Sequence, residues 1–203
     1  FHLVAVGAEK IPDIAGKHPQ AVIDELRGGG ALVYIGHPSW SGLGRTDLFP
    51  LHDYNGVEVA NHGCREVFRM FSEDHWDDVN TWQGITAGTA VDDGHRLSDI
   101  GGAWVMVKAA ENAPNAIMDA LRRGMFYSSM GPELHSIDVE PATPGKPGDP
   151  PGARITVSCS PARAAYIRSI PAYGAFIEGK GMTRVEFPPK RRDVFCRVVV
   201  EDA

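Results

Sequence analysis

Three histidines and one aspartate stand where strand-like segments begin or end. His2 lies in the apolar segment FHLVAV, His37 follows an apolar run that ends at Gly36, and Asp93 and His95 close the segment VDDGH. Neutral imidazole and carboxylate are the usual protein ligands of Zn²⁺, Mn²⁺ and Fe²⁺. If the segment is extended, the Asp93-x-His95 spacing places both side chains on one face. We expect these four residues to meet at a metal site, with His37, Asp93 and His95 acting in catalysis.

Each of these residues also has a structural interpretation. His2 could be a packed core histidine, His37 a turn residue before Pro38, and the segment 92–94 a simple turn. Their coincidence at strand ends favours a functional site over three unrelated explanations.

Three further residues are candidates for binding substrate. His62 lies in Asn61-His62-Gly63, directly after a strand-like segment, and Arg45 and Arg65 could hold the charge of an anionic substrate. Exposed arginines are commoner than phosphate clamps, so a surface role is the alternative. The other histidines, His18, His52, His75 and His135, read as caps, loop residues or surface residues.

An alternation of strand-like and helix-like segments must position these residues. Apolar runs bounded by glycine predict strands over residues 1–6, 31–36, 56–60, 85–91 and 104–107, the first of them buried on both faces. Helical spacing predicts helices over 19–27, about 64–82 and 114–123. This order favours a parallel sheet or barrel, in which the carboxyl ends of the strands meet at one mouth.

The composition changes after Gly131-Pro132. Residues 141–152 read PATPGKPGDPPG, which is typical of a loop, and the apolar segments that follow have no helical period. We expect a barrel-type domain over residues 1–132 and a small antiparallel β domain over residues 133–203.

Charge and composition exclude several classes of protein. The chain has 203 residues, 43% of them hydrophobic, and a formal net charge of −6, so we expect neither a nucleic-acid partner nor a membrane span. Its three cysteines, Cys64, Cys159 and Cys196, are far apart, which indicates no disulfide framework and favours a reducing compartment such as the cytoplasm. The expected partner is a small-molecule substrate, and the oligomeric state is open.

Five segments in order resemble the polymerase-and-histidinol-phosphatase (PHP) metallohydrolases, and most closely the CehA/McbA-like branch. They are FHLVAVG (1–7), GHPSW (36–40), GVEVAN (56–61), TAVDDGH (89–95) and ALRRGMFYSSMGP (120–132). The resemblance covers residues 1–132.

The resemblance implies a distorted (β/α)7 barrel with two or three divalent metal ions, zinc, manganese or iron, at the strand carboxyl ends. His2 matches the histidine of the family's middle motif, His37 that of the His-Pro motif, and Asp93 and His95 the final Asp-x-His pair. The family's first motif, a His-x-His pair with a following aspartate, would lie before Phe1. The resemblance therefore implies the C-terminal part of a barrel, truncated at both ends and lacking part of the family's ligand set, followed by a sandwich-like β domain; whether the chain as given is active stays open.

The expected activity is metal-dependent hydrolysis, with a phosphoester as the leading substrate class and metal-activated water as the nucleophile. A carbamate or amide hydrolase is the first alternative, because the same hydroxide can attack a carbonyl carbon. A non-catalytic binding module is the second.

Overall fold

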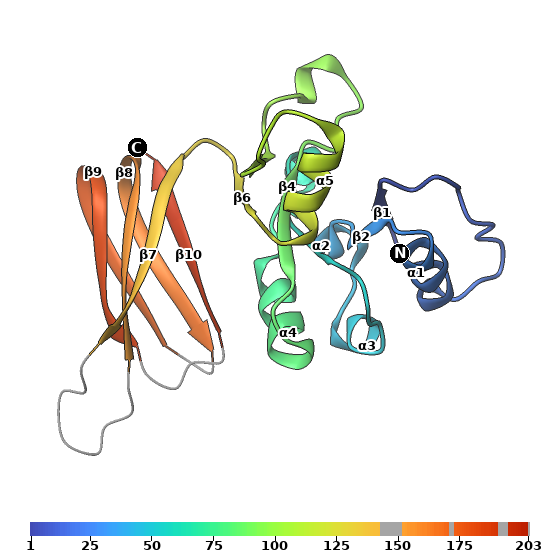
Figure 1. Cartoon of the computed structure of the whole chain (residues 1–203), viewed down its shortest axis with the longest axis horizontal. Helices are drawn as coiled ribbons and strands as arrows, with labels where there is room; N and C mark the ends of the chain where they lie inside the picture. The colour runs from blue at the N-terminus through green and yellow to red at the C-terminus, as the bar shows by residue number, and fades with distance from the viewer. Residues whose placement is uncertain (143–151, 171–172, 191–194, 203) are drawn as a thin grey trace. The chain divides into compact units, whose positions relative to one another are not determined.

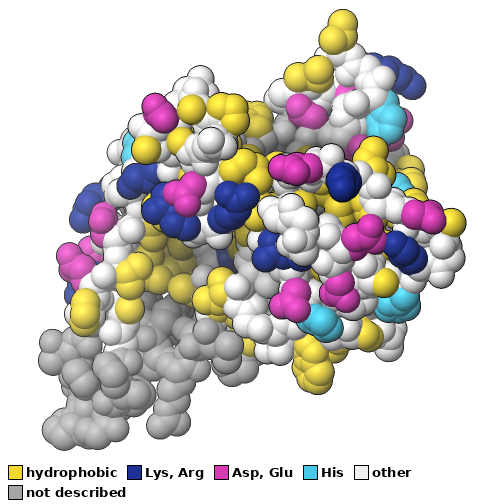
Figure 2. All heavy atoms as spheres, turned by 45° about the vertical axis from the view of Figure 1, so that its right-hand side comes forward, with side chains coloured by type: hydrophobic (Ala, Val, Ile, Leu, Met, Phe, Trp, Pro, Cys, Tyr) yellow, Lys and Arg dark blue, Asp and Glu magenta, His cyan; other side chains and the backbone are white. Residues whose placement is uncertain are grey.

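The computed structural model describes residues 1–142, 152–170, 173–190 and 195–202, and the chain divides into two compact units, Phe1–Met130 and Gly131–Ala203 (Figure 1). Within the described residues, no helix is both long enough and apolar enough to cross a membrane. Positive and negative side chains are interspersed over the face drawn in Figure 2.

A four-stranded sheet forms the centre of the first unit. Its strands are β1 (Leu3–Val6), β2 (Leu32–Ile35), β3 (Gly56–Asn61) and β4 (Ala87–Val91), in that spatial order. Strands β2, β3 and β4 are parallel, whereas β1 runs antiparallel to β2. Strands β5 (Trp104–Val107) and β6 (Phe126–Ser129) form a separate antiparallel pair.

Short helices connect these strands. They are α1 (Pro19–Gly28), α2 (Pro38–Ser41), α3 (Arg45–Leu48), η1 (His62–Val67), α4 (Glu73–Gln83), η2 (Leu97–Asp99) and α5 (Pro114–Arg122). Helix α1 begins at a proline whose missing N–H costs nothing there, and the Nδ1 atom of His18 caps it by accepting the N–H of Gln20 at 3.2 Å. Its apolar face is buried through Val22, Ile23 and Leu26.

The core of the first unit lies between α1 and the sheet. All four residues of β2 are buried, as expected for a strand with a neighbour on either side and helices against it. The core cluster also takes in Leu48 of α3, Val57 of β3 and Val79 of α4. This core therefore supports β2 and β3, whereas Ala90 of β4 packs in a smaller cluster with Ala60 and Ala103.

The second unit contains only strands among its described residues. They are β7 (Leu134–Ala142), β8 (Gly152–Ile170), β9 (Tyr173–Lys190) and β10 (Phe195–Asp202), all paired antiparallel. Strand β8 pairs with β7 through its first half and with β10 through its second half, while β9 pairs with both halves. Register shifts near Ser158 and Ala162 mark the change of partner.

The mixed α/β class is confirmed, but two expectations for the first unit are wrong. The continuous helix over about 64–82 is absent, because Phe68 has φ +55° and ends η1, and Phe71 pairs with Ala60 in an isolated bridge. The strand expected to be buried on both faces is the edge strand β1, where Val4 is 39% exposed.

A closed (β/α)7 barrel is also not found in the described part of the first unit. The antiparallel β1 makes one edge of the four-stranded sheet, and β5 with β6 forms a sheet of its own. In the second unit, the apolar segments 155–159 and 164–170 belong to a single bulged strand, β8. The predicted loop lies mostly at 143–151, outside the described residues.

We predict that Ile23→Ala destabilises the first unit by about 2–5 kcal/mol, because Ile23 is 0% exposed in the core and its truncation leaves a cavity. Ile11→Ala is the matched control, since Ile11 is 95% exposed, and it should change the free energy of unfolding by less than about 0.5 kcal/mol. Urea unfolding of both variants checks this, and equal effects would contradict the assigned core.

Candidate metal and substrate site

The antiparallel pairing of β1 with β2 brings His2 to His37. Leu3 lies opposite Ile35, and the N–H of Gly36 donates to the carbonyl of His2 at 2.9 Å. The amino end of β1 thus lies beside the carboxyl end of β2. The Nδ1 atom of His2 is 2.9 Å from the Nε2 atom of His37, so two imidazole nitrogens from distant segments face each other.

The His37 ring is held on its other side by the short helix that follows it. The Nδ1 atom of His37 lies 3.1 Å from the Oγ of Ser41, and the Trp40 ring packs at 5.0 Å from the imidazole. His37 is 6% exposed and has φ +26°, an unfavourable backbone conformation for a residue with a side chain. In the tautomer in which Nδ1 donates to Ser41, Nε2 is the nitrogen with the lone pair, and it is directed at His2.

A buried carboxylate in β3 links three strand ends. The Oε2 atom of Glu58 accepts the N–H of His37 at 2.8 Å and the Nδ2 of Asn61 at 3.0 Å. Asn61 also donates to the Oδ2 of Asp93 at 3.2 Å. The ends of β2, β3 and β4 are therefore joined by one continuous set of hydrogen bonds.

Burial raises the pKa of Glu58, although its hydrogen bonds to Asn61 and His37 oppose the shift. Burial, together with the charges of Asp93 and Glu58, raises the pKa of Cys64 to about 11. Cys64 is consequently a protonated thiol at neutral pH.

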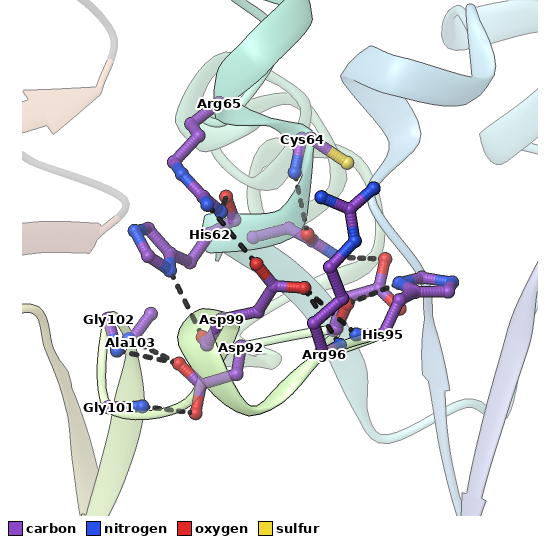
Figure 3. A network of polar contacts seen from close by, with 12 residues as sticks. His62, Cys64, Arg65, Asp92, His95, Arg96, Asp99, Gly101, Gly102 and Ala103 are labelled. Atoms are coloured by element: carbon purple, nitrogen blue, oxygen red, sulfur yellow. Dashed lines mark hydrogen bonds and ion pairs between the residues drawn. The ribbon is translucent and has the colours of Figure 1, made fainter.

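Two aspartates fix the loop between β4 and β5. The carboxylate of Asp92 accepts the N–H groups of Gly101, Gly102 and Ala103 at 2.8, 2.8 and 2.9 Å, which closes the base of the loop (Figure 3). These hydrogen bonds, led by those from Gly101 and Ala103, lower the pKa of Asp92.

Asp99 fixes the middle of the same loop. Its Oδ2 atom accepts the N–H groups of His95 and Arg96 at 3.1 and 3.0 Å, and its Oδ1 atom pairs with Arg65 at 3.2 Å. The hydrogen bond from Arg65 is the main cause that lowers the pKa of Asp99. The loop is thus tied both to itself and to η1.

His95 lies in this loop, but the expected extended geometry of Asp93-x-His95 is not observed. Asp93 has φ +48°, and the Nδ1 of His95 is 2.8 Å from the carbonyl oxygen of Asp93. Because a carbonyl only accepts, Nδ1 carries a hydrogen in this contact, and in the neutral imidazole Nε2 is then the nitrogen with the lone pair. Both side chains are exposed, and the His95 ring is oriented by the backbone of Asp93.

The three substrate-binding candidates have different surroundings. His62 of η1 contacts the carbonyl oxygen of Asp99 through Nδ1 at 3.3 Å, so its ring packs against the β4–β5 loop, as Figure 3 shows. Arg65 is in the same network but is neutralised by Asp99. Arg45 forms a two-pronged ion pair with Asp78 of α4, through Nε and Nη2 at 2.8 and 2.7 Å, and takes no part in this network.

Glu58, Asn61 and Ser41 are not among the site residues predicted from the sequence. A carboxylate alternating with valines in a strand is the usual pattern of a solvent-facing residue, and only the parallel neighbours of β3 show that Glu58 is buried. The available signal was the run GVEVAN itself, which places an acid within an otherwise apolar segment.

The nitrogens of His2 and His37 supply part of the coordination shell that a metal ion needs. Two nitrogens that bind one zinc ion tetrahedrally at ~2.0–2.1 Å lie ~3.3 Å apart, and the His2–His37 pair at 2.9 Å needs little movement to reach this. Within the described ranges, however, no group of three His, Cys, Asp or Glu side chains is close enough to hold an ion. His2 and His37 therefore provide two donors, and the remaining coordination positions need other ligands.

We predict that Gly102→Ala displaces the ring of His62, because a Cβ atom at this position would overlap the imidazole. The expected cost is about 1–3 kcal/mol in the free energy of unfolding, with a shift of the His62 ring resonances in NMR spectra. Gly94→Ala is the control in the same loop, since its Cβ would meet no atom nearer than 3.6 Å. If Gly102→Ala leaves both readouts unchanged, the close packing of loop and ring is wrong.

We predict that Asp92→Asn lowers the melting temperature at pH 7 by several degrees. The pKa of Asp92 is lowered in the folded state, so its contribution is present above the unfolded value of 3.8 and is lost as the pH falls through the lower folded value. The difference in melting temperature between wild type and variant should therefore shrink on acidification. A difference that stays constant between pH 7 and pH 2 would show that charge at Asp92 is not what holds the loop.

Comparisons with known proteins support the fold. No protein-family model matches the chain, and no curated protein matches it. The structure is similar to the crystal structure of a two-domain protein from Bacteroides vulgatus ATCC 8482 that contains a predicted PHP-like metal-dependent phosphoesterase, with a TM-score of 0.52 and 14% sequence identity. The match covers 94% of this chain and 62% of that chain, so this chain spans less than two thirds of its neighbour's length.

Proposed function

We propose that this chain is a PHP-type, metal-dependent hydrolase of phosphoesters, of the CehA/McbA-like branch. The observation that carries the proposal is the meeting of His2 Nδ1 and His37 Nε2, 2.9 Å apart, at the edge where β2, β3 and β4 end. The fold similarity to a chain that contains a predicted PHP-like phosphoesterase supports the same assignment.

In this proposal His2 and His37 hold a divalent ion, zinc, manganese or iron. Bound there, the ion would lower the pKa of a water ligand and polarise the phosphoryl oxygen. Ser41 orients His37 by accepting its Nδ1–H, which keeps Nε2 unprotonated. Glu58 fixes the backbone of His37 and, through Asn61, the position of Asp93.

Asp93 and His95 complete the proposed site from the end of β4. The carboxylate of Asp93 is directed to Asn61, and the exposed Nε2 of His95 has a lone pair that can bind an ion or take a proton. A set of two or three ions would need donors beyond these four side chains, such as water and substrate oxygens.

The test is hydrolysis of p-nitrophenyl phosphate and bis(p-nitrophenyl) phosphate by the chain, with Mn²⁺ or Zn²⁺ added and with a chelator. We expect metal-dependent turnover by the wild type. In both His37→Ala and Asp93→Ala, we expect kcat/KM to fall about 100-fold or more and metal binding in equilibrium dialysis to weaken. His135→Ala is the control, because His135 lies in the second unit.

Each other outcome points to a different function. Metal-dependent cleavage of a carbamate or anilide without phosphoester cleavage would favour the amide-bond alternative. Equal metal binding by wild type and His37→Ala would contradict the proposal and favour a non-catalytic binding module.

A further inference from the structure

We propose that Arg96 binds the phosphoryl oxygens of the substrate, and that the loop of residues 92–103 is built to present it. The inference rests on the proposed function and adds a substrate class, since it selects anionic phosphomonoesters over neutral carbamates and amides.

The arginines considered first are already engaged. Arg45 is paired with Asp78, and Arg65 is paired with Asp99 and also donates to the carbonyl of His62 at 2.9 Å. Arg69 donates to the carbonyl of Ser39 at 3.0 Å. The charges of Arg45 and Arg65 are therefore largely balanced before any substrate arrives.

Arg96 differs from them. Across the described part of the chain, its guanidinium forms no hydrogen bond and no ion pair, and the residue is exposed. Asp99, three residues further on, would be a natural partner for it, yet its carboxylate binds Arg65 and the backbone N–H groups of His95 and Arg96 instead. The loop thus holds the backbone of Arg96 and leaves its charge available.

The position of Arg96 in the fold suits a substrate ligand. It follows Asp93 by three residues, and Asp93 is joined through Asn61 and Glu58 to His37. In Figure 3 its side chain extends from the His95 side of the loop, away from the segment Gly101–Ala103 that Asp92 binds. The loop is anchored at both ends by Asp92, so the position of Arg96 is defined before binding.

The chemistry of guanidinium indicates the ligand. Its planar array of N–H donors matches two oxygens of a phosphate, and it remains charged at every physiological pH. A phosphomonoester offers two such oxygens that do not react. A neutral carbamate or amide offers no anion to balance this charge.

The experiment uses the chain with Mn²⁺ and compares wild type with Arg96→Gln and Arg96→Lys. Arg123→Gln is the control, because it also removes an exposed positive charge, one that pairs with Asp119 on α5. The probes are inorganic phosphate in calorimetry, and p-nitrophenyl phosphate and the neutral p-nitrophenyl acetate in kinetics. For Arg96→Gln we expect the Kd of phosphate and the KM of the phosphoester to rise about ten- to hundred-fold, with a smaller change in kcat. For Arg96→Lys, the Kd of phosphate and the KM of the phosphoester should lie between those of wild type and Arg96→Gln. The rate of acetate hydrolysis should not change in either variant.

The two proposals fail in different ways. If no variant hydrolyses any ester, but wild type binds phosphate and Arg96→Gln does not, the proposed function fails and the Arg96 subsite is supported. If hydrolysis occurs but phosphate affinity and KM are the same in wild type and Arg96→Gln, the Arg96 proposal is overturned. Absence of phosphate binding by wild type overturns it as well.

Discussion

The carboxylate of Glu58 is the constraint on which the candidate site depends. A buried carboxylate is costly unless hydrogen-bonded, and Glu58 is 4% exposed with burial as the main cause of its raised pKa. One of its oxygens accepts both the His37 N–H and the Asn61 amide. The unfavourable backbone of His37 is thereby compensated, and the ring is set where β1 delivers His2.

The β4–β5 loop shows the same use of carboxylates on a more exposed part of the fold. Asp92 and Asp99 both have lowered pKa values because each accepts N–H groups or an arginine. Neither is therefore available as a strong base at neutral pH. In the proposal above, the loop offers a ligand the guanidinium of Arg96, which suits an anion better than a neutral group.

The alternation of elements in the first unit could be predicted because apolar runs and bounding glycines or prolines are local signals. The helix over 64–82 failed because Val67, Phe68 and Phe71 have helical spacing but are 53%, 96% and 54% exposed, so their period reflects no buried face. Strand β9 was not distinguished, since Gly174, Gly179 and Gly181 interrupt its pattern.

For the candidate site, the sequence indicates which residues to consider but not how they meet in space. The meeting of His2 with His37 was expected from parallel strands, whereas an antiparallel edge strand brings it about. The place of Glu58 depends on a tertiary contact that no local pattern encodes, since its carboxylate accepts the N–H of His37 from a neighbouring strand end.

The most direct test of the account is a crystal structure of the chain grown with zinc, with anomalous diffraction collected at the zinc edge. The account predicts an anomalous peak at ~2.0–2.1 Å from both His2 Nδ1 and His37 Nε2. An absence of density there, with the two imidazoles still hydrogen-bonded directly to each other under saturating zinc, would contradict it.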